Sequence, residues 1–196
     1  MICCDFHTHC RVAPAAGTAV LVSAGSLPVE TAPEQYWSLE LHPWYLPETW
    51  QGLPETFREE VMRADAVGEI GLDRLRGPAM PVQIAYCRAA LQAARDCRKP
   101  VVFHCVRAFA ELLMLVREVG CEHKLLHGFR GPAAFLAEVR RHGFLVSGAT
   151  LADPAGTGCG LETDDRPETI AERYQSAGGN AAAEQMAENF YGFLGK

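Results

Sequence analysis

The chain has 196 residues, 48% of them hydrophobic, and a formal net charge of −6. This length supports one well-buried core and is short for two, so we predict a single domain over residues 1–196. An acidic chain without a basic run does not favour strong non-specific binding to duplex nucleic acid, and no stretch approaches the ~20 apolar residues that span a membrane.

The eight cysteines are scattered irregularly along the chain. The sequence also opens without the charged start and apolar run of a secretory signal. Both features favour reduced thiols over a secreted, disulfide-stabilised module. We therefore expect a cytoplasmic protein.

Short apolar runs alternate with amphipathic stretches, which is typical of a mostly parallel α/β protein. Strands are predicted at residues 2–7, 19–24, 36–41, 66–70, 100–104, 123–127, 143–148 and 159–163. Apolar residues at helical spacing predict helices at residues 55–64, 81–97, 107–119, 132–142, 167–177 and 181–193.

Three connections between predicted strands are too short and too rich in Pro, Gly and Ala to hold a full helix. They run from Cys10 to Thr18, from Gly25 to Gln35 and from Gly148 to Gly158. Eight strands with helices on part of the circumference predict a shortened (β/α)8 TIM-type barrel, with several helices reduced to loops. A doubly wound open sheet is the main alternative, but no Gly-rich phosphate loop follows the first strand.

The first strand carries a His-x-His motif. If this strand continues to His9, side-chain alternation places Asp5, His7 and His9 on one face. Two imidazoles at a strand end can reach one divalent ion. Alone the motif is a weak signal, because histidines on an inward face can also be structural.

Metal-capable side chains recur at the ends of later strands. They are His42, Glu69, His104, His127 and Asp164. In a parallel barrel these ends converge on one mouth, where barrel enzymes place their chemistry. The ordered set favours metal ligands over buried structural histidines, and over a Glu69 that pairs with an arginine.

The motifs resemble those of the TatD family of metal-dependent hydrolases, within the amidohydrolase-type barrels. The resemblance covers nearly the whole chain, in the order Asp5-Phe6-His7-Thr8-His9, Leu41-His42-Pro43, Gly68-Glu69-Ile70-Gly71-Leu72-Asp73, Phe103-His104, Leu126-His127-Gly128-Phe129 and Glu162-Thr163-Asp164. It implies that one or two divalent ions are held by His7, His9, Glu69, His104, His127 and Asp164, with Glu69 bridging both ions.

The predicted ligand set also indicates the chemistry. Imidazole-rich ligands favour Zn, Mn or Ni over Mg, and we expect Zn first while Mn, Ni and Mg stay open. His7 and His9 with Glu69 would hold one ion, and Glu69, His104 and His127 the other. Asp164 is expected to be both a ligand and the base that takes a proton from the attacking water, so Asp164 and Glu69 are the predicted catalytic residues.

Arg107 and Arg130 each follow a predicted ligand by three residues, where a guanidinium can grip a phosphate. His42 is predicted either as a substrate contact or as a structural residue.

The resemblance implies a phosphoester substrate, including single-stranded DNA, and a deoxyribonuclease or phosphodiesterase activity. An amide or ester hydrolase of the deacylase kind, or a non-catalytic metal-binding barrel, is the alternative. Asp165 is expected either to hydrogen-bond a ligand or to cap the helix that follows it, and we favour the cap.

Overall fold

A computed structural model of the protein describes residues 2–28, 30–153 and 155–196. The strands are β1 (Cys3–Thr8), β2 (Thr18–Ala24), β3 (Gln35–Leu39), β4 (Ala66–Asp73), β5 (Val101–Val106), β6 (Lys124–Leu126), β7 (Phe144–Gly148) and β8 (Cys159–Leu161). The helices are α1 (Phe57–Arg63), α2 (Met80–Asp96), α3 (Phe109–Val119), α4 (Ala133–Arg141), α5 (Ile170–Ser176) and α6 (Ala183–Leu194), with the short 3₁₀ turns η1 (Pro43–Tyr45) and η2 (Gly179–Ala182).

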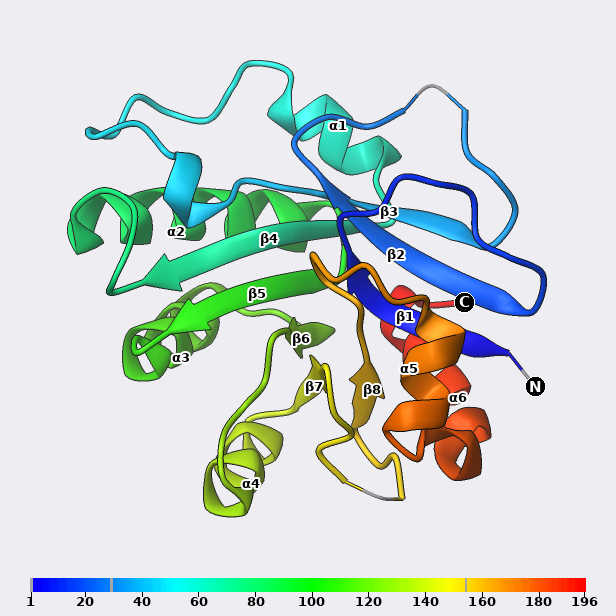
Figure 1. Ribbon diagram of the computed structural model, residues 1–196. Helices are drawn as coiled ribbons and strands as arrows, with labels where there is room; N and C mark the ends of the chain where they lie inside the picture. Colours follow the sequence, from blue (N-terminus) through cyan, green and yellow to red (C-terminus); the bar gives the residue numbers. More distant parts are fainter. Residues whose placement is uncertain (1, 29, 154) are drawn as a thin grey trace. The chain divides into compact units, whose positions relative to one another are not determined.

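The eight strands are hydrogen-bonded in chain order and close into a barrel (Figure 1). The pairs β1–β2, β3–β4, β4–β5, β7–β8 and β1–β8 are all parallel. The predicted TIM-type barrel is therefore confirmed. The connections from β1 to β2, from β2 to β3 and from β7 to β8 contain no helix among their described residues, which is how the barrel is shortened.

The residue contacts of the chain group into two compact units. The first unit comprises Met1–Ser23, Pro28–Tyr36 and Leu125–Lys196. The second comprises Ala24–Leu27 and Trp37–Lys124. The prediction that residues 1–196 form a single domain stays a prediction.

In the first unit, β1 lies against α5 and α6 (Figure 1). Phe6 is fully buried, and its ring packs edge-on against Phe190 of α6 with the centroids 5.3 Å apart. The hydroxyl of Tyr174 in α5 accepts a hydrogen bond from the Cys4 amide at 3.0 Å. Because side chains alternate along a strand, Asp5 and His7 point to the opposite face. β1 ends at Thr8, one residue short of the predicted continuation to His9.

In the second unit, α2 packs against the fully buried strand β4, which pairs with β5. Gln83, in the first turn of α2, is 1% exposed. Its side-chain oxygen accepts the Asp73 amide at 2.7 Å, and its Nε2 donates to the carbonyls of Asp73, Arg76 and Pro78 at 2.8–3.0 Å. One buried amide side chain therefore fixes the backbone that leaves β4.

The ends of β6 and β8 and the start of α5 differ from the predictions for local reasons. β6 and β8 each have three residues, so His127 and Glu162 lie just beyond strand ends. α5 begins at Ile170, because Thr169 and Glu172 form a reciprocal capping box. The predicted cap role of Asp165 is therefore wrong. Within the described ranges, every helix is too short or too polar to cross a membrane.

Two glycine-to-alanine variants test how tightly the first unit is packed. An alanine Cβ at Gly160 in β8 would lie 2.2 Å from the Phe6 ring, whereas at Gly192 in α6 it would meet no atom within 4 Å. We expect Gly160→Ala to lower the free energy of unfolding by about 1–3 kcal/mol through overpacking. Gly192→Ala should raise it by about 0.5–1 kcal/mol, because alanine loses less backbone entropy in a helix. Urea unfolding measures both, and equal effects would contradict the packing described for Phe6.

Candidate functional site

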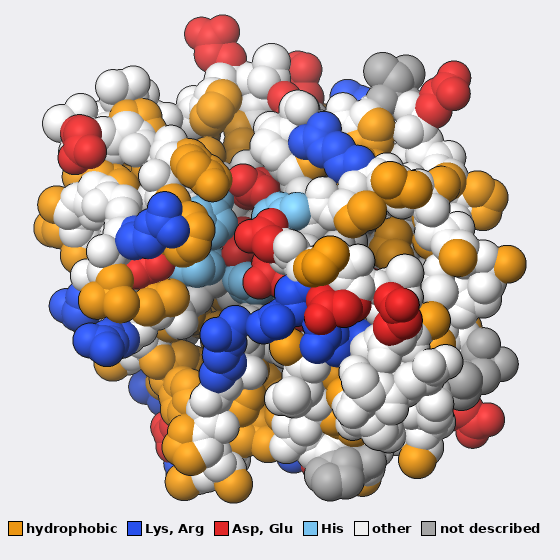
Figure 2. Space-filling view, in the orientation of Figure 1, with side chains coloured by type: hydrophobic (Ala, Val, Ile, Leu, Met, Phe, Trp, Pro, Cys, Tyr) orange, Lys and Arg blue, Asp and Glu red, His pale blue; other side chains and the backbone are white. Residues whose placement is uncertain are grey.

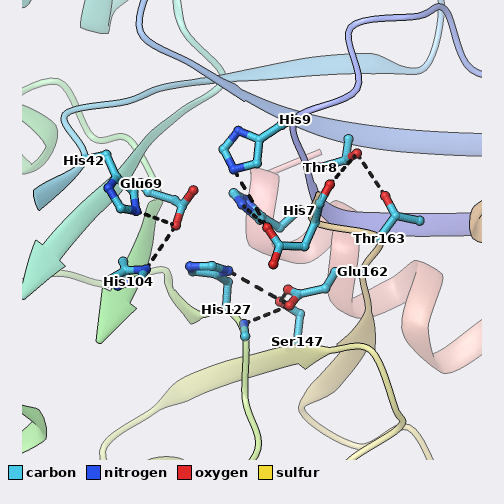
Figure 3. Close-up of polar contacts among 12 residues, drawn as sticks. His7, Thr8, His9, His42, Glu69, His104, His127, Ser147, Glu162 and Thr163 are labelled. Atoms are coloured by element: carbon cyan, nitrogen blue, oxygen red, sulfur yellow. Dashed lines mark hydrogen bonds and ion pairs between the residues drawn. The ribbon is translucent and has the colours of Figure 1, made fainter. Parts of the chain in front are cut away.

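The first unit brings four predicted ligands together. His7 is the last but one residue of the buried strand β1, and His9 directly follows that strand. His127 directly follows β6, and Asp164 lies shortly after β8. The ring centroids of His7 and His9 are 5.0 Å apart, and those of His7 and His127 are 4.3 Å apart. We call these four residues the first cluster, and Figure 3 labels its three histidines.

Asp164 lies within ion-binding reach of the histidines. Its Oδ1 is 3.8 Å from Nε2 of both His7 and His9. His7, His127 and Asp164 each offer a ligand atom within 4.8 Å of the others. His9, Asp164 and the exposed Asp165 form a second such group, but exposed acids gather often without an ion.

Backbone hydrogen bonds place Asp164 beside β1. The Asp164 amide donates to the His7 carbonyl at 3.0 Å, and the His9 amide donates to the Asp164 carbonyl at 3.3 Å. Asp164 has a φ of 55°, in the left-handed region that Asp tolerates better than most residues. The parallel bridge between Thr8 and Asp164 thus continues the barrel seam to the ligands.

A buried acid lies directly behind this seam. The carboxylate of Asp5 accepts the Thr163 hydroxyl at 2.6 Å and the Thr163 amide at 3.0 Å. Burial raises the pKa of Asp5 to about 7, against the lowering effect of these hydrogen bonds. The hydroxyl oxygens of Thr163 and Thr8 also lie within hydrogen-bond distance, 2.9 Å apart, so Thr163 links β1 with the residues after β8.

Glu162 is a second buried acid of this unit (Figure 3). Its Oε2 accepts the Ser147 hydroxyl at 2.5 Å, and its Oε1 accepts the Gly128 amide at 2.9 Å. The same Oε1 is 4.0 Å from Nδ1 of His127. Burial raises the pKa of Glu162 to about 7, although His127 and Ser147 lower it. A carboxylate behind a ligating histidine is the usual outer partner in metal sites.

The second unit groups His42, Glu69 and His104, which we call the second cluster. Nε2 of His42 and Nδ1 of His104 each lie 3.4 Å from the same oxygen, Oε2 of Glu69. All three side chains are buried, and their ligand atoms lie within 4.8 Å of one another. Figure 3 shows both imidazoles directed at the Glu69 carboxylate.

Asp73 and Trp44 extend this cluster. Nε2 of His104 is 3.0 Å from Oδ2 of Asp73, and the Trp44 indole donates to the same oxygen at 2.6 Å. Burial alone would raise the pKa of Asp73, but hydrogen bonds from Trp44, His104 and Leu75 hold it below its usual value. For His104, burial would lower the pKa, whereas Glu69 and Asp73 raise it. His104 therefore lies between two carboxylates, an environment that favours positive charge.

The donor sets of both clusters fit a divalent cation. Two ligand atoms each about 2.1 Å from a tetrahedral ion lie about 3.4 Å from each other. The His104–Glu69 separation of 3.4 Å matches that spacing. Imidazole nitrogens mixed with carboxylate oxygens are ligands that zinc and the neighbouring transition metals accept.

Arg107 and Arg130, the predicted phosphate contacts, are both exposed. Arg107 directly follows β5, and its carbonyl accepts a hydrogen bond from Nε of Arg74 at 2.9 Å. Arg130 lines a hollow of about 380 Å³ in the first unit, together with Phe129, Leu136 and Thr150. In the space-filling view, histidine side chains are visible at the drawn surface (Figure 2).

The structure thus groups the predicted residues within each unit. His7, His9, His127 and Asp164 meet in the first, and His42, Glu69 and His104 in the second. The predicted sharing of ions between Glu69 and histidines of the first unit stays a prediction. The sequence assigned no role to five residues that support the ligands, of which only Trp44 is partly exposed, although acids beside strand ends are a signal for such partners: Trp44, Asp73, Ser147, Glu162 and Thr163.

Thr163→Val tests whether the hydroxyl supports the buried Asp5. We expect this variant to lower the free energy of unfolding by about 1–3 kcal/mol, because a buried carboxylate loses a donor. Thr157→Val, at an exposed position, is the matched control and should leave stability unchanged. Urea unfolding compares the stability of the two variants. Equal urea midpoints for Thr163→Val and Thr157→Val would show that Asp5 does not need this hydrogen bond.

Comparisons with known proteins agree with these features. A family model described as TatD related DNase matches residues 21–154, a span that includes His42, Glu69, His104 and His127 and ends before Asp164. No curated protein matches the chain. The fold is similar to that of YjjV, a TatD homolog from Escherichia coli K12, with a TM-score of 0.70 and 20% identity over 98% of this chain and 97% of that chain.

A hydrolase of the TatD family from Entamoeba histolytica is also similar in fold, with a TM-score of 0.57 and 16% identity. That match covers 76% of this chain and 61% of the other. At these identities the structural matches establish the fold, while the family model covers more than half of the sequence. The chain therefore belongs to the TatD family.

Proposed function

We propose that this protein is a divalent-metal-dependent phosphodiesterase, with single-stranded DNA among its substrates. The family and its fold support a metal-dependent hydrolase. The observation that carries the proposal is the convergence of imidazoles on one carboxylate oxygen, at Asp164 in the first cluster and at Glu69 in the second. The description of the matching family model as a DNase supports the choice of a phosphoester bond.

Each cluster offers ligands of its own. In the first, His7, His9, His127 and Asp164 would hold a divalent ion, and in the second Glu69 and His104 would do so. One or two ions are part of the proposal. Zinc is the first choice because imidazole nitrogens predominate, and Mn, Ni and Mg are the alternatives.

A bound divalent ion lowers the pKa of a coordinated water and stabilises negative charge on a phosphoryl oxygen. Asp164 is the proposed base, because its carboxylate is partly exposed at 32% and can accept a proton from an attacking water. Glu69 and the histidines orient the reacting groups. Arg107 and Arg130 are the proposed phosphate contacts, since a guanidinium donates two parallel hydrogen bonds to phosphate oxygens.

The activity prediction concerns Asp164. With Zn, Mn or Mg, the wild-type protein should hydrolyse bis(p-nitrophenyl) phosphate and a single-stranded DNA oligomer. Asp164→Asn should lower kcat about 10²–10⁴-fold, because the amide cannot take a proton. Asp165→Asn, the neighbouring exposed acid, is the control and should keep the wild-type rate.

Other outcomes of that assay separate the alternatives. Hydrolysis of p-nitrophenyl acetate or an N-acyl amino acid, without phosphodiester cleavage, would replace the proposal by a deacylase-like activity. Failure with every substrate and every metal would favour a non-catalytic metal-binding barrel.

Metal binding itself is tested by thermal unfolding. After chelation and dialysis, adding a metal at 100 times its dissociation constant should stabilise the native protein by about 2.7 kcal/mol. The stabilisation by metal should fall in His7→Ala and His104→Ala, each compared with its own metal-free form. His123→Ala, an exposed histidine outside both clusters, is the control. If none of Zn, Mn, Ni and Mg raises the thermal unfolding midpoint of the wild-type protein, that result contradicts the proposed metal site.

A further inference from the structure

Trp44 gives two different hydrogen bonds to the second cluster. Its backbone amide donates to Nδ1 of His42 at 3.2 Å, and its indole Nε1 donates to Oδ2 of Asp73 at 2.6 Å. Trp44 is held in η1, directly after Pro43, and the Arg76 guanidinium carbon lies 3.6 Å from its ring centroid. One residue therefore contacts His42, which lies beside Glu69, and Asp73, which lies beside His104.

The first bond fixes the tautomer of His42. An N–H group donates only to a nitrogen that carries a lone pair, so neutral His42 has its proton on Nε2. That Nε2 lies 3.4 Å from Oε2 of Glu69. A nitrogen that bears a proton has no lone pair to offer a metal. His42 is therefore a hydrogen-bond donor to Glu69, despite its position in a metal-capable group.

The second bond acts on His104 through Asp73. Oδ1 of Asp73 accepts the amides of Leu75 and Arg76 at 2.8 and 3.1 Å, and Oδ2 accepts the Trp44 indole. A carboxylate surrounded by donors is ionised and accepts only. Nε2 of His104, 3.0 Å from Oδ2, must then donate its proton. Nδ1, which faces Glu69, is therefore the ring nitrogen of His104 that can give up its proton and bind a metal.

We propose that Trp44 is a positioning residue that sets both tautomers, directly at His42 and through Asp73 at His104, so that only Glu69 and His104 of the second cluster bind metal. This inference rests on the proposed metal-binding function. It assigns His42 a role on Glu69, in place of the substrate contact predicted from the sequence. The His42 side chain is 6% exposed and both of its ring nitrogens face protein atoms.

Nitrogen-15 NMR of the imidazoles in the wild-type protein tests the proposal directly, because ring nitrogens with and without a proton have distinct chemical shifts. In metal-free protein, at a pH where the imidazoles are neutral, His42 should be protonated at Nε2 and unprotonated at Nδ1. Zinc should shift Nδ1 of His104 and leave the His42 tautomer unchanged. A proton on Nδ1 of His42, before or after zinc is added, would overturn the proposal.

A pair of tryptophan variants adds an independent measurement. Trp44→Phe keeps the hydrogen bond from the backbone amide to His42 but removes the indole donor to Asp73. We expect the zinc affinity to fall about 10-fold, because the loss of a hydrogen-bond partner behind a metal ligand weakens binding by about that much. Trp50→Phe changes a half-exposed tryptophan of the same unit and should keep the affinity. Equal zinc affinities in the two variants would overturn the proposed action of the Trp44 indole on His104 through Asp73.

The two proposals fail in different ways. If the wild-type protein binds no metal, the proposed function fails, while the tautomers of the metal-free protein still decide the role of Trp44. If metal binds and His42 Nε2 loses its proton on binding, the function stands and the positioning role of Trp44 fails.

Discussion

The hydrogen bonds between the end of β1 and the residues after β8 are the constraint on which the first cluster depends. The Asp164 amide binds the His7 carbonyl and the His9 amide binds the Asp164 carbonyl, so a parallel pairing continues past the last strand. Asp164 lies 156 residues after Thr8 in the chain. These backbone hydrogen bonds fix the position of Asp164 relative to His7 and His9. The three side chains therefore lie close together although they are distant in the sequence.

Buried carboxylates behind the ligands give both clusters a similar electrostatic design. Asp5 and Glu162 accept hydroxyl and amide donors in the first unit, and Asp73 accepts indole, imidazole and amide donors in the second. The outcomes differ, since burial raises the pKa of Asp5 and Glu162 to about 7, whereas the donors hold the pKa of Asp73 low. A divalent ion held by the proposed ligands would favour the ionised form of all three acids and would thereby couple their protonation to metal binding.

The periodicity of the sequence predicted the eight strands and six α-helices of the described residues, because apolar runs and helical spacing are local signals. The boundaries of the elements were less predictable. β8 ends at Leu161, and the next residue, Glu162, accepts a hydrogen bond from Ser147. α5 begins only after the capping box at Thr169. Histidines and acids at strand ends were predictable as ligand candidates. The roles of Trp44 and Asp73 were not, because they depend on which donor meets which acceptor after folding, and sequence spacing does not encode that.

The discontinuous first unit has a consequence for synthesis on the ribosome. The second unit is nearly continuous in sequence, from Trp37 to Lys124, whereas the first needs both the opening strand and the stretch from Leu125 onward. Asp164 is the 155th residue after His9, and at about 5–20 residues per second this stretch takes roughly 8–30 s to make. The histidine pair thus leaves the ribosome long before the acid that will lie beside it. A nascent chain that has reached Lys124 already contains every residue of the second cluster, whereas the first cluster is complete in the chain only once Asp164 has been made.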